Sequence, residues 1–590
     1  MTDVSGAEDL VLAAEFPAAS REKWLALVAK VVGVEDPRVA ERELTTELFA
    51  DVETAPLYVS AGATDLGLPG QAPFVRGRTS HGSLGGWDVR VRHDHPVAAT
   101  AHDQILEDLE GGASSLWLGV GTSAIGVDSL AEVLDAVFLE LITVALDPGP
   151  EFVATADRYL AVADDRGLGF GELSVRFGAD PIGLEAASGS AGDLAAAVEL
   201  AGRSSREFPN ARALTVDALP FHLAGADDAQ EIGCSLAVGA EYLRGMRAAG
   251  LDADAAFGEL EFRYAATADQ FLTIAKLRAA RQTWSSVAQS CGVTGPSAGQ
   301  LQHAVSSPAM QTQRDPWNNI LRGTLAAFSA GVGGADAITV APFDAAIGYS
   351  DRLARRVARN THALLVEESN VARTIDPAGG SWYVEQLTAD VARRAWRVFQ
   401  TIERAGGALA ALRSGALDAE LATSRDARLT ALAHRSVPIT GVTEFPNAEE
   451  TLLARDLRPE APVAGLPRLR WAQSFEASRD RSDAYAAANG EPPTVTTAKV
   501  GDPKQSGMRL SAVTAALASG GIRTETSNPG AASRAVAVVG IAEDAAPEDV
   551  HAEVERLRGA GAQLVIERAA GDLDVLALHE QVLAALGVPS

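Results

Sequence analysis

Residues 261–388 hold the stretch of sequence that decides the fold. Apolar, β-branched or aromatic runs are followed there by Ala- and Leu-rich segments, with turns rich in Asp, Pro and Gly between them. Strands that alternate with helices are typical of parallel sheets built from β/α units. We therefore interpret the stretch as the second half of a parallel β/α barrel. Its most distinctive segments are EFRYAATAD (261–269), IAKLRAAR (274–281), QRDPWNN (313–319), APFD (341–344) and DPAGGS (376–381).

The same alternation extends over residues 45–390. Most neighbouring strand candidates are roughly 20 to 40 residues apart, which leaves room for a crossover helix and two loops. Eight such units predict an α/β fold with a (β/α)8 TIM barrel. An open doubly wound sheet is the alternative, but no Gly-x-Gly-x-x-Gly turn follows the first strand to support dinucleotide binding. The strand candidates are 88–92, 115–121, 141–146, 173–177, 213–218, 261–265, 301–305 and 337–341.

Two further segments flank the predicted barrel. Residues 1–44 form an N-terminal arm for subunit contact, with one amphipathic helix that Ser20 caps and that carries Leu27 and Val31 at helical spacing. The apolar face of this helix needs a surface to cover, either on a second subunit or on the barrel itself. Residues 391–493 are helical and then Pro-rich, which predicts a connector because proline cannot continue a helix.

Residues 494–590 predict a second, compact domain. Short β-branched runs alternate there with apolar stripes at helical spacing, and the first stripe stops at Gly520 and Gly521. We expect a flavodoxin-like domain with parallel strands. Its strand candidates are 494–500, 522–525, 535–541 and 563–566.

Composition narrows the classes of function. The chain has 590 residues and a net charge of −28, so its length predicts several domains and its acidic surface repels nucleic acid and anionic membranes. A phosphorylated small molecule is not excluded, because a local basic pocket can bind it. Cys234 and Cys291 are too few for a disulfide framework or a Cys-based zinc site and suggest reduced thiols in a cytoplasmic protein. We expect neither a signal peptide nor a membrane span.

Several of these motifs stand in the order typical of one enzyme family. The chain resembles the adenosylcobalamin-dependent acyl-CoA mutases, above all methylmalonyl-CoA mutase, most strongly at 274–281, 315–319, 358–361 and 376–381. The resemblance implies a barrel that encloses acyl-CoA and a C-terminal cobalamin domain. It also implies a radical rearrangement that interconverts (R)-methylmalonyl-CoA and succinyl-CoA. In such reactions the cofactor performs the difficult step, while the protein binds, orients and shields.

The cobalamin-binding residues of the family are changed in this chain. The lower axial ligand of cobalt is a histidine in Asp-x-His-x-x-Gly, but the matching turn is DPKQSG (502–507), with Lys504 in its place. A protonated lysine has no lone pair for cobalt, and a reference pKa of about 10.4 keeps it protonated. In the pocket for the nucleotide tail, AED (542–544) replaces Ser-x-Leu and RA (568–569) replaces Gly-Gly. We expect a degenerate cobalamin-binding domain.

Two positions of the family's substrate site are changed as well. The histidine that polarises the thioester carbonyl aligns with Pro220, although His222 would point the same way along an extended strand. The tyrosine that lies over the corrin, five residues after a tryptophan, aligns with Arg92, five after Trp87. The resemblance therefore implies no catalytic, cofactor-binding or metal-binding residue in this chain.

A chain that keeps the family's fold but lacks its active site implies a second subunit that carries out catalysis. The resemblance points to the small (beta) subunit of a heterodimeric methylmalonyl-CoA mutase, or of another acyl-CoA mutase. The large catalytic (alpha) subunit would then hold adenosylcobalamin, the acyl-CoA substrate and the active site. Stability, assembly and regulation all stay open as roles of the small chain.

An alternative of another class rests on His93 and His95. Two imidazoles at a strand end are typical of metal-dependent TIM-barrel hydrolases, and His102 and Asp103 would be further ligands. The competing interpretation is a set of solvated loop and helix-start residues, because no convincing ligand set stands at the later strand ends.

The basic residues in the family's motifs also have two interpretations. Arg314 and Arg359 either bind phosphate groups of CoA or are structural, with Asp315 as a helix N-cap and Pro316 in the first turn. The turn at 376–381 has glycines that permit positive φ, as barrel geometry requires. The remaining cations share one helix and are expected on a solvated or salt-bridged face: Lys276, Arg278 and Arg281.

Overall fold

The computed structural model describes most of the chain, in two compact units that comprise residues 1–64 and 65–590. The described residues are 15–17, 19–49, 51–59, 66–82, 85–459, 464–528, 532–568 and 573–589. Of the positions discussed above, Ala569 and most of residues 1–19 lie outside them.

The first unit contains two helices and a hairpin. Helix α1 (Arg21–Val32) begins after Ser20, whose side chain accepts a hydrogen bond from the Lys23 amide, as expected. Helix α2 (Pro37–Leu44) and the antiparallel strands β1 (Thr46–Phe49) and β2 (Val52–Thr54) follow. Leu27 and Val31 on α1 are 65% and 87% exposed. This exposure leaves the apolar face of α1 open to solvent.

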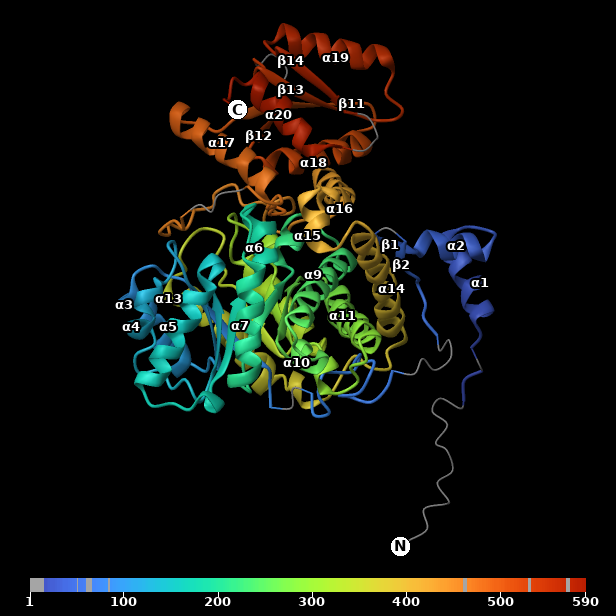
Figure 1. Ribbon diagram of the computed structural model, residues 1–590. Helices are drawn as coiled ribbons and strands as arrows, with labels where there is room; N and C mark the ends of the chain where they lie inside the picture. Colours follow the sequence, from blue (N-terminus) through green and yellow to red (C-terminus); the bar gives the residue numbers. More distant parts are fainter. Residues whose placement is uncertain are drawn as a thin grey trace. The chain divides into compact units, whose positions relative to one another are not determined.

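Eight parallel strands form a closed barrel in the order β10-β3-β4-β5-β6-β7-β8-β9. Figure 1 shows the helices that pack around this barrel. All eight strand predictions are confirmed, and no strand end differs by more than two residues. The alternative prediction of an open doubly wound sheet was wrong, because β10 pairs in parallel with β3 and closes the barrel. The strands are β3 (Asp88–His93), β4 (Ser115–Gly119), β5 (Thr143–Asp147), β6 (Ser174–Ala179), β7 (Arg212–Asp217), β8 (Leu260–Ala266), β9 (Gln302–Ser306) and β10 (Ala337–Thr339).

Helices surround the barrel, and small residues let them pack closely. A β-carbon at Gly239 would lie 2.9 Å from the ring of Trp284, so α9 and α11 approach each other through glycine. Helix α14 packs against both of them, and residue 390, where the barrel was expected to end, falls inside it. The main helices of this layer are α3 (Ala98–Glu110), α5 (Phe152–Asp165), α7 (Leu194–Glu207), α9 (Asp228–Ala248), α11 (Gln270–Ser290), α12 (Asn318–Val332), α13 (Arg352–Ala363) and α14 (Trp382–Arg404).

The following segment includes α15 (Ala408–Arg413), α16 (Ala416–Ala433) and α17 (Gln473–Asn489). Its extended part between α16 and α17 returns to the barrel. The amides of Leu466, Leu469 and Trp471 donate to the carbonyls of Ala186, Leu223 and Ala309 at 2.7–2.9 Å. These bonds fix the segment over the loops that follow the barrel strands.

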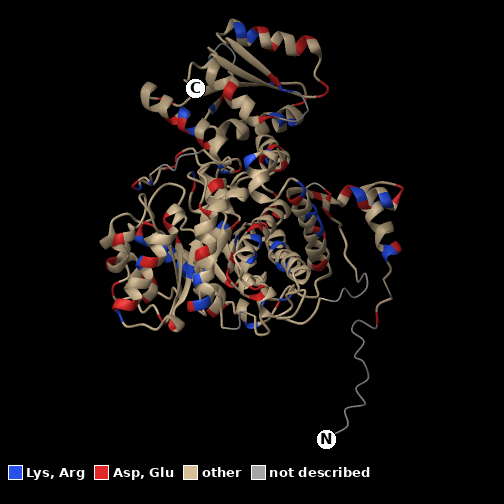
Figure 2. Cartoon of the chain, viewed as in Figure 1, with Lys and Arg blue, Asp and Glu red and all other residues tan. Residues whose placement is uncertain are grey.

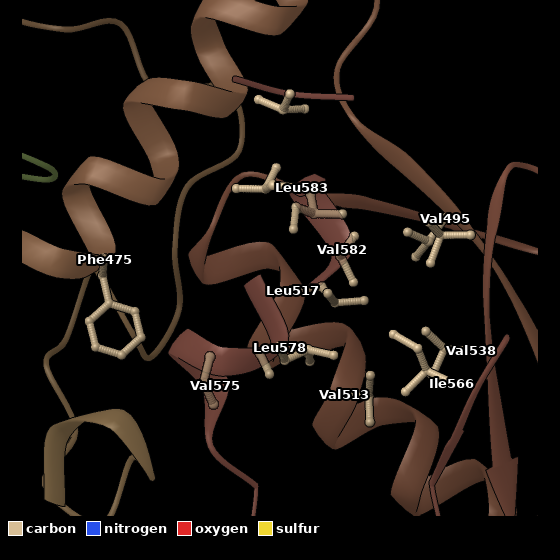
Figure 3. Packing of buried hydrophobic residues seen from close by; sticks show 14 of the residues in the cluster. Phe475, Val495, Val513, Leu517, Val538, Ile566, Val575, Leu578, Val582 and Leu583 are labelled. Carbon is tan, nitrogen blue, oxygen red and sulfur yellow. The ribbon is translucent and has the colours of Figure 1, made fainter. Parts of the chain in front are cut away.

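The C-terminal domain is a parallel sheet in the order β12-β11-β13-β14. Its strands β11 (Thr494–Val500), β12 (Arg523–Thr526), β13 (Val536–Ile541) and β14 (Leu564–Arg568) match the four strand predictions. Its helices are α18 (Pro503–Ser519), α19 (Pro547–Gly559) and α20 (Val575–Ala585). Phe475 of α17 joins the core formed by β11, β13, α18 and α20, as Figure 3 shows.

Charged side chains lie mainly on the outer helices. Figure 2 shows both signs on α19, where acidic residues of the first turn precede Arg556 and Arg558. This order favours the helix dipole at both ends. Within the described ranges, no helix has the length and apolar character needed to cross a membrane.

Candidate functional site

A cavity of about 650 Å³ lies at the C-terminal ends of the barrel strands. Active sites of parallel barrels form at this end, from the loops that follow the strands. Arg92 and Pro220, the two changed substrate-site positions, both line it, and residues Leu466–Arg470 of the connecting segment cover part of it. The position of the cavity is therefore that of a barrel active site.

Arg92 is held by ion pairs of this chain. Its Nη1 lies 2.7 Å from Asp147 Oδ2 and its Nε lies 3.0 Å from Asp94 Oδ2. Burial opposes the charge, but Asp147 and Asp94 raise the pKa of Arg92 above its ordinary value. The guanidinium carbon is 4.2 Å from the centre of the Trp117 ring, and that of Arg263 is equally close. Arg92 is thus paired within the chain, in the wall of the cavity.

Pro220 and His222, the two residues considered at the position of the family's histidine, point in different directions. They belong to a helical turn, α8 (Leu219–Leu223), so the expected extended strand was wrong. Residues two apart in a helix point about 200° away from each other, and Pro220 lines the cavity whereas His222 does not. The His222 ring lies 2.7 Å from Ser307 Oγ and 3.4 Å from Glu231 Oε2. His222 is therefore committed to a buried polar network.

Lys276 and Arg278 of α11 are buried and form salt bridges, which confirms the salt-bridged alternative for these two residues. Lys276 Nζ lies 2.9 Å from Asp228 Oδ1 and 2.8 Å from Glu231 Oε2. Arg278 bonds to Glu385 at 2.7 Å and to Asp376, which has a positive φ of 47° in its turn. The network had no signal in the sequence beyond charged residues in an otherwise apolar, Ala-rich helix.

Arg281, the third cation of α11, instead binds main-chain carbonyls. It donates to Phe74 at 3.0 Å and to Gly333 at 2.7 Å. Burial lowers the pKa of Arg281 to about 9. Its role is to join the loop before β3 to the loop after α12.

The two arginines considered for CoA phosphate have partners within the chain. Arg314 pairs with Asp480 and with Asp483 (2.8 Å) of α17, and Arg359 pairs with Asp108. Asp315 is not the N-cap of α12, because it takes a left-handed φ of 42° and the helix starts three residues later. Its carboxylate instead accepts from the Asn318 side chain at 2.6 Å.

The histidines proposed for a metal do not converge. Burial and the nearby Arg355 lower the pKa of His93 to about 3, so its ring is neutral. The His95 ring lies 4.8 Å from that of Tyr349, and His102 Nδ1 is 3.3 Å from the Val133 carbonyl oxygen. Asp103 is exposed. In the part of the chain that is described, no three His, Cys, Asp or Glu residues group as metal ligands.

In the C-terminal domain, hydrogen bonds join the two loops between which a doubly wound sheet would bind a ligand. That place is the crevice between β11 and β13, from which the chain leaves in opposite directions. The Asp502 amide donates to Asp544 Oδ1 at 3.1 Å, and the Glu543 amide donates to the Gln505 side chain at 3.2 Å. A β-carbon at Gly501 would lie 2.8 Å from that of Ala542.

Lys504 stands at the rim of this crevice, on the first turn of α18. Its amide donates to Asp502 Oδ1 at 3.1 Å, and its side chain is exposed. Arg509 of the same helix pairs with Glu543 at 2.9 Å. Tested against a cobalamin, these residues do not fit, because none of them is a histidine and the loops on the two sides of the crevice are hydrogen-bonded to each other.

A closed (β/α)8 barrel followed by a parallel C-terminal sheet is the architecture that the resemblance implied for the acyl-CoA mutases. The family model described as methylmalonyl-CoA mutase matches residues 118–488. The chain belongs to the methylmalonyl-CoA mutase family.

Proteins similar to this chain include some that are named small subunits of methylmalonyl-CoA mutase and some that are named methylmalonyl-CoA mutase. The methylmalonyl-CoA mutase small subunit of Streptomyces virginiae is 50% identical over 502 residues, which cover 84% of this chain and 81% of the relative. The small subunit of Propionibacterium freudenreichii subsp. shermanii is 38% identical over 511 residues, 85% and 80% of the two chains. The methylmalonyl-CoA mutase of Cereibacter sphaeroides is 26% identical over 511 residues, 79% and 70%. Identity is thus higher to the two chains named small subunits.

Proposed function

We propose that this chain is the small, non-catalytic subunit of a heterodimeric methylmalonyl-CoA mutase. The observation that carries the proposal is that changed residues at both ligand sites of the family are paired with partners of this chain. Arg92 pairs with Asp147 in the wall of the barrel cavity, and the loops at Asp502 and Asp544 are hydrogen-bonded across the cofactor crevice. The higher identity to chains named small subunits supports the same assignment.

In this proposal the large subunit holds adenosylcobalamin and acyl-CoA and performs the rearrangement of (R)-methylmalonyl-CoA to succinyl-CoA in propionate metabolism. The residues of that subunit decide which acyl-CoA reacts, so a different mutase partner is the second candidate. The small chain contributes to the stability, the assembly or the regulation of the complex. The exposed face of α1 supports a contact between the arm and the large subunit, because permanent interfaces are rich in apolar surface. Cys234 and Cys291 are free, which agrees with a cytoplasmic complex.

The proposal is tested with the purified full-length chain and with a co-expressed large subunit. Alone, the chain should elute without cobalamin after incubation with adenosylcobalamin and should not convert methylmalonyl-CoA. Together, the two chains should elute as a one-to-one complex that contains cobalamin and is active. Stoichiometric cobalamin on the isolated chain would overturn the non-catalytic assignment, and separate elution of the two chains would overturn the heterodimer.

A further inference from the structure

The cavity at the barrel mouth carries polar groups that the chain does not satisfy. Gln311 is 2% exposed, and neither its Oε1 nor its Nε2 has a hydrogen-bond partner among the described residues. The same holds for Nε1 of Trp117, Oγ of Ser350 and Nδ1 of His93, whose Nε2 lies 3.6 Å from Asp108 Oδ2. All four side chains belong to residues that line the cavity. A buried polar group without a partner costs about 1–3 kcal/mol, so such a cluster favours a polar ligand.

The rest of the wall is largely apolar. Parallel-barrel loops and the connecting segment contribute aliphatic, proline and aromatic side chains to it. These residues are Leu219, Leu223, Val305, Pro308, Val340 and Leu469. A volume of about 650 Å³ lies within the range of roughly 300–1,000 Å³ that is typical of small-molecule sites. A ligand with an apolar body and one polar end therefore matches the wall.

The charges around the cavity indicate the sign of the polar end. Arg458 pairs with Asp94 at 2.6 Å and Arg470 pairs with Glu476 at 2.6 Å. Arg355 and Arg359 share Asp108. Arg468 also lines the cavity and is exposed, and no ion pair of its guanidinium occurs within the described ranges. One cation without an ion pair, in the wall of the same cavity as the donor Trp117 Nε1, attracts a single negative charge.

We propose that this cavity binds a small organic carboxylate with an apolar tail. The carboxylate lies toward Arg468, the amide of Gln311 supplies a donor and an acceptor, and the aliphatic wall buries the tail. The site is independent of catalysis, because it needs neither cobalamin nor a reacting thioester. It is also independent of the heterodimer, because every residue that it uses belongs to this chain.

Octanoate is a suitable probe, and octanamide is its neutral counterpart of the same shape. Isothermal titration of the full-length chain should show saturable one-to-one binding of octanoate and weaker binding of octanamide. Arg468→Ala should weaken octanoate binding by about fivefold, the usual effect of a solvent-exposed charge pair, and should leave octanamide unchanged. Arg203→Ala, which alters an outer helix away from the cavity, is the matched control.

Two further variants separate binding in the cavity from binding elsewhere. Ala345→Trp places a large ring in the cavity and should abolish binding of both probes, while Gln311→Leu should weaken both. Circular dichroism and the unfolding midpoint show whether each variant is folded. Octanoate that fails to saturate, that binds equally well after Ala345→Trp in a folded protein, or that binds no better than octanamide would overturn the proposal.

Discussion

Residue 504 alone does not decide whether the C-terminal domain binds cobalamin. Lys504→His would restore the ligand type, but the crevice beside it is bridged through Asp502, Asp544 and the Gln505 side chain. We expect the variant to elute without cobalamin after incubation with adenosylcobalamin, as measured by visible absorption. A methylmalonyl-CoA mutase chain that keeps the histidine of Asp-x-His-x-x-Gly is the positive control. One equivalent of cobalamin retained by the variant would show that the single substitution had caused the loss.

Lys276 neutralises two buried carboxylates, those of Asp228 and Glu231. Lys276→Met would leave them unpaired beside each other in the interior. Breaking a buried pair by removing one partner costs about 3–5 kcal/mol, and we expect a loss of this size in the free energy of unfolding in urea. Lys499→Met, on an exposed side chain, should change it by less than about 0.5 kcal/mol. Equal effects of the two substitutions would show that the network contributes nothing specific.

Sequence comparison could identify the changed positions but could not place them in space. Pro220 and Arg92 were found by alignment, and both line the same cavity. The direction of His222 was wrong, because a short run after a strand can turn into a helix without a change in composition. One partner of Arg92, Asp94, is only two residues away in the sequence, whereas Asp147 comes from β5 and is brought close by the barrel.

At the level of secondary-structure elements, Glu259 links α10 (Ala253–Gly258) to β7. It is 4% exposed, its Oε2 accepts from the Ala213 amide at 3.0 Å, and burial raises its pKa to about 7. Because the folded pKa exceeds the unfolded value of about 4.3, the folded state binds the proton more tightly. Stability therefore falls as the pH rises from about 4 to 7.

Glu259→Gln keeps an acceptor oxygen for Ala213 and removes the titration. As the pH rises from 5 to 8, the original chain should lose about 3 kcal/mol of unfolding free energy that the variant does not lose. This value follows from the size of the pKa shift of Glu259. Urea unfolding at both pH values measures it. Parallel pH profiles for the two proteins would contradict the buried-carboxyl interpretation.

The helix α1 provides a test of the proposed subunit contact. Leu27→Asp together with Val31→Asp places two charges on its exposed apolar face. We expect the affinity for the large subunit to fall by at least tenfold, because unpaired charges are costly in an interface core. The helix itself should stay folded, since both side chains are already solvent-exposed. Leu452→Asp, at another exposed leucine, is the control, and unchanged affinity would exclude α1 from the interface.

Element positions followed closely from the pattern of apolar residues. All twelve strand predictions are confirmed, because buried parallel strands are short β-branched runs between turn signals. The predicted start of α12 was wrong by two residues. Asp315 was interpreted as a helix N-cap, but its backbone adopts a left-handed conformation. A positive φ at a residue other than glycine has no strong sequence signal.

At the scale of the whole molecule, the packing of the core bears on the predicted domain boundary near residue 493. The last helix before it, α17, contributes Phe475 to the core that contains Leu578 and Val582 of α20 (Figure 3). Other members of this core also precede residue 493, among them Ile439 and Val442. The connecting segment is thus part of the C-terminal core, although its sequence showed only helical and Pro-rich character.

Phe475→Ala in the full-length chain should therefore weaken the C-terminal sheet and spare the barrel. Phe475 is 1% exposed, and truncation of a buried phenylalanine costs about 3–5 kcal/mol. Hydrogen exchange should report this loss in the opening free energy of β11 and β13, with β4 and β5 unchanged. Met508→Ala, at a residue of α18 that is 60% exposed, should leave both sheets unaffected. Equal loss of protection in barrel and C-terminal strands would mean that the two sheets unfold as one cooperative unit.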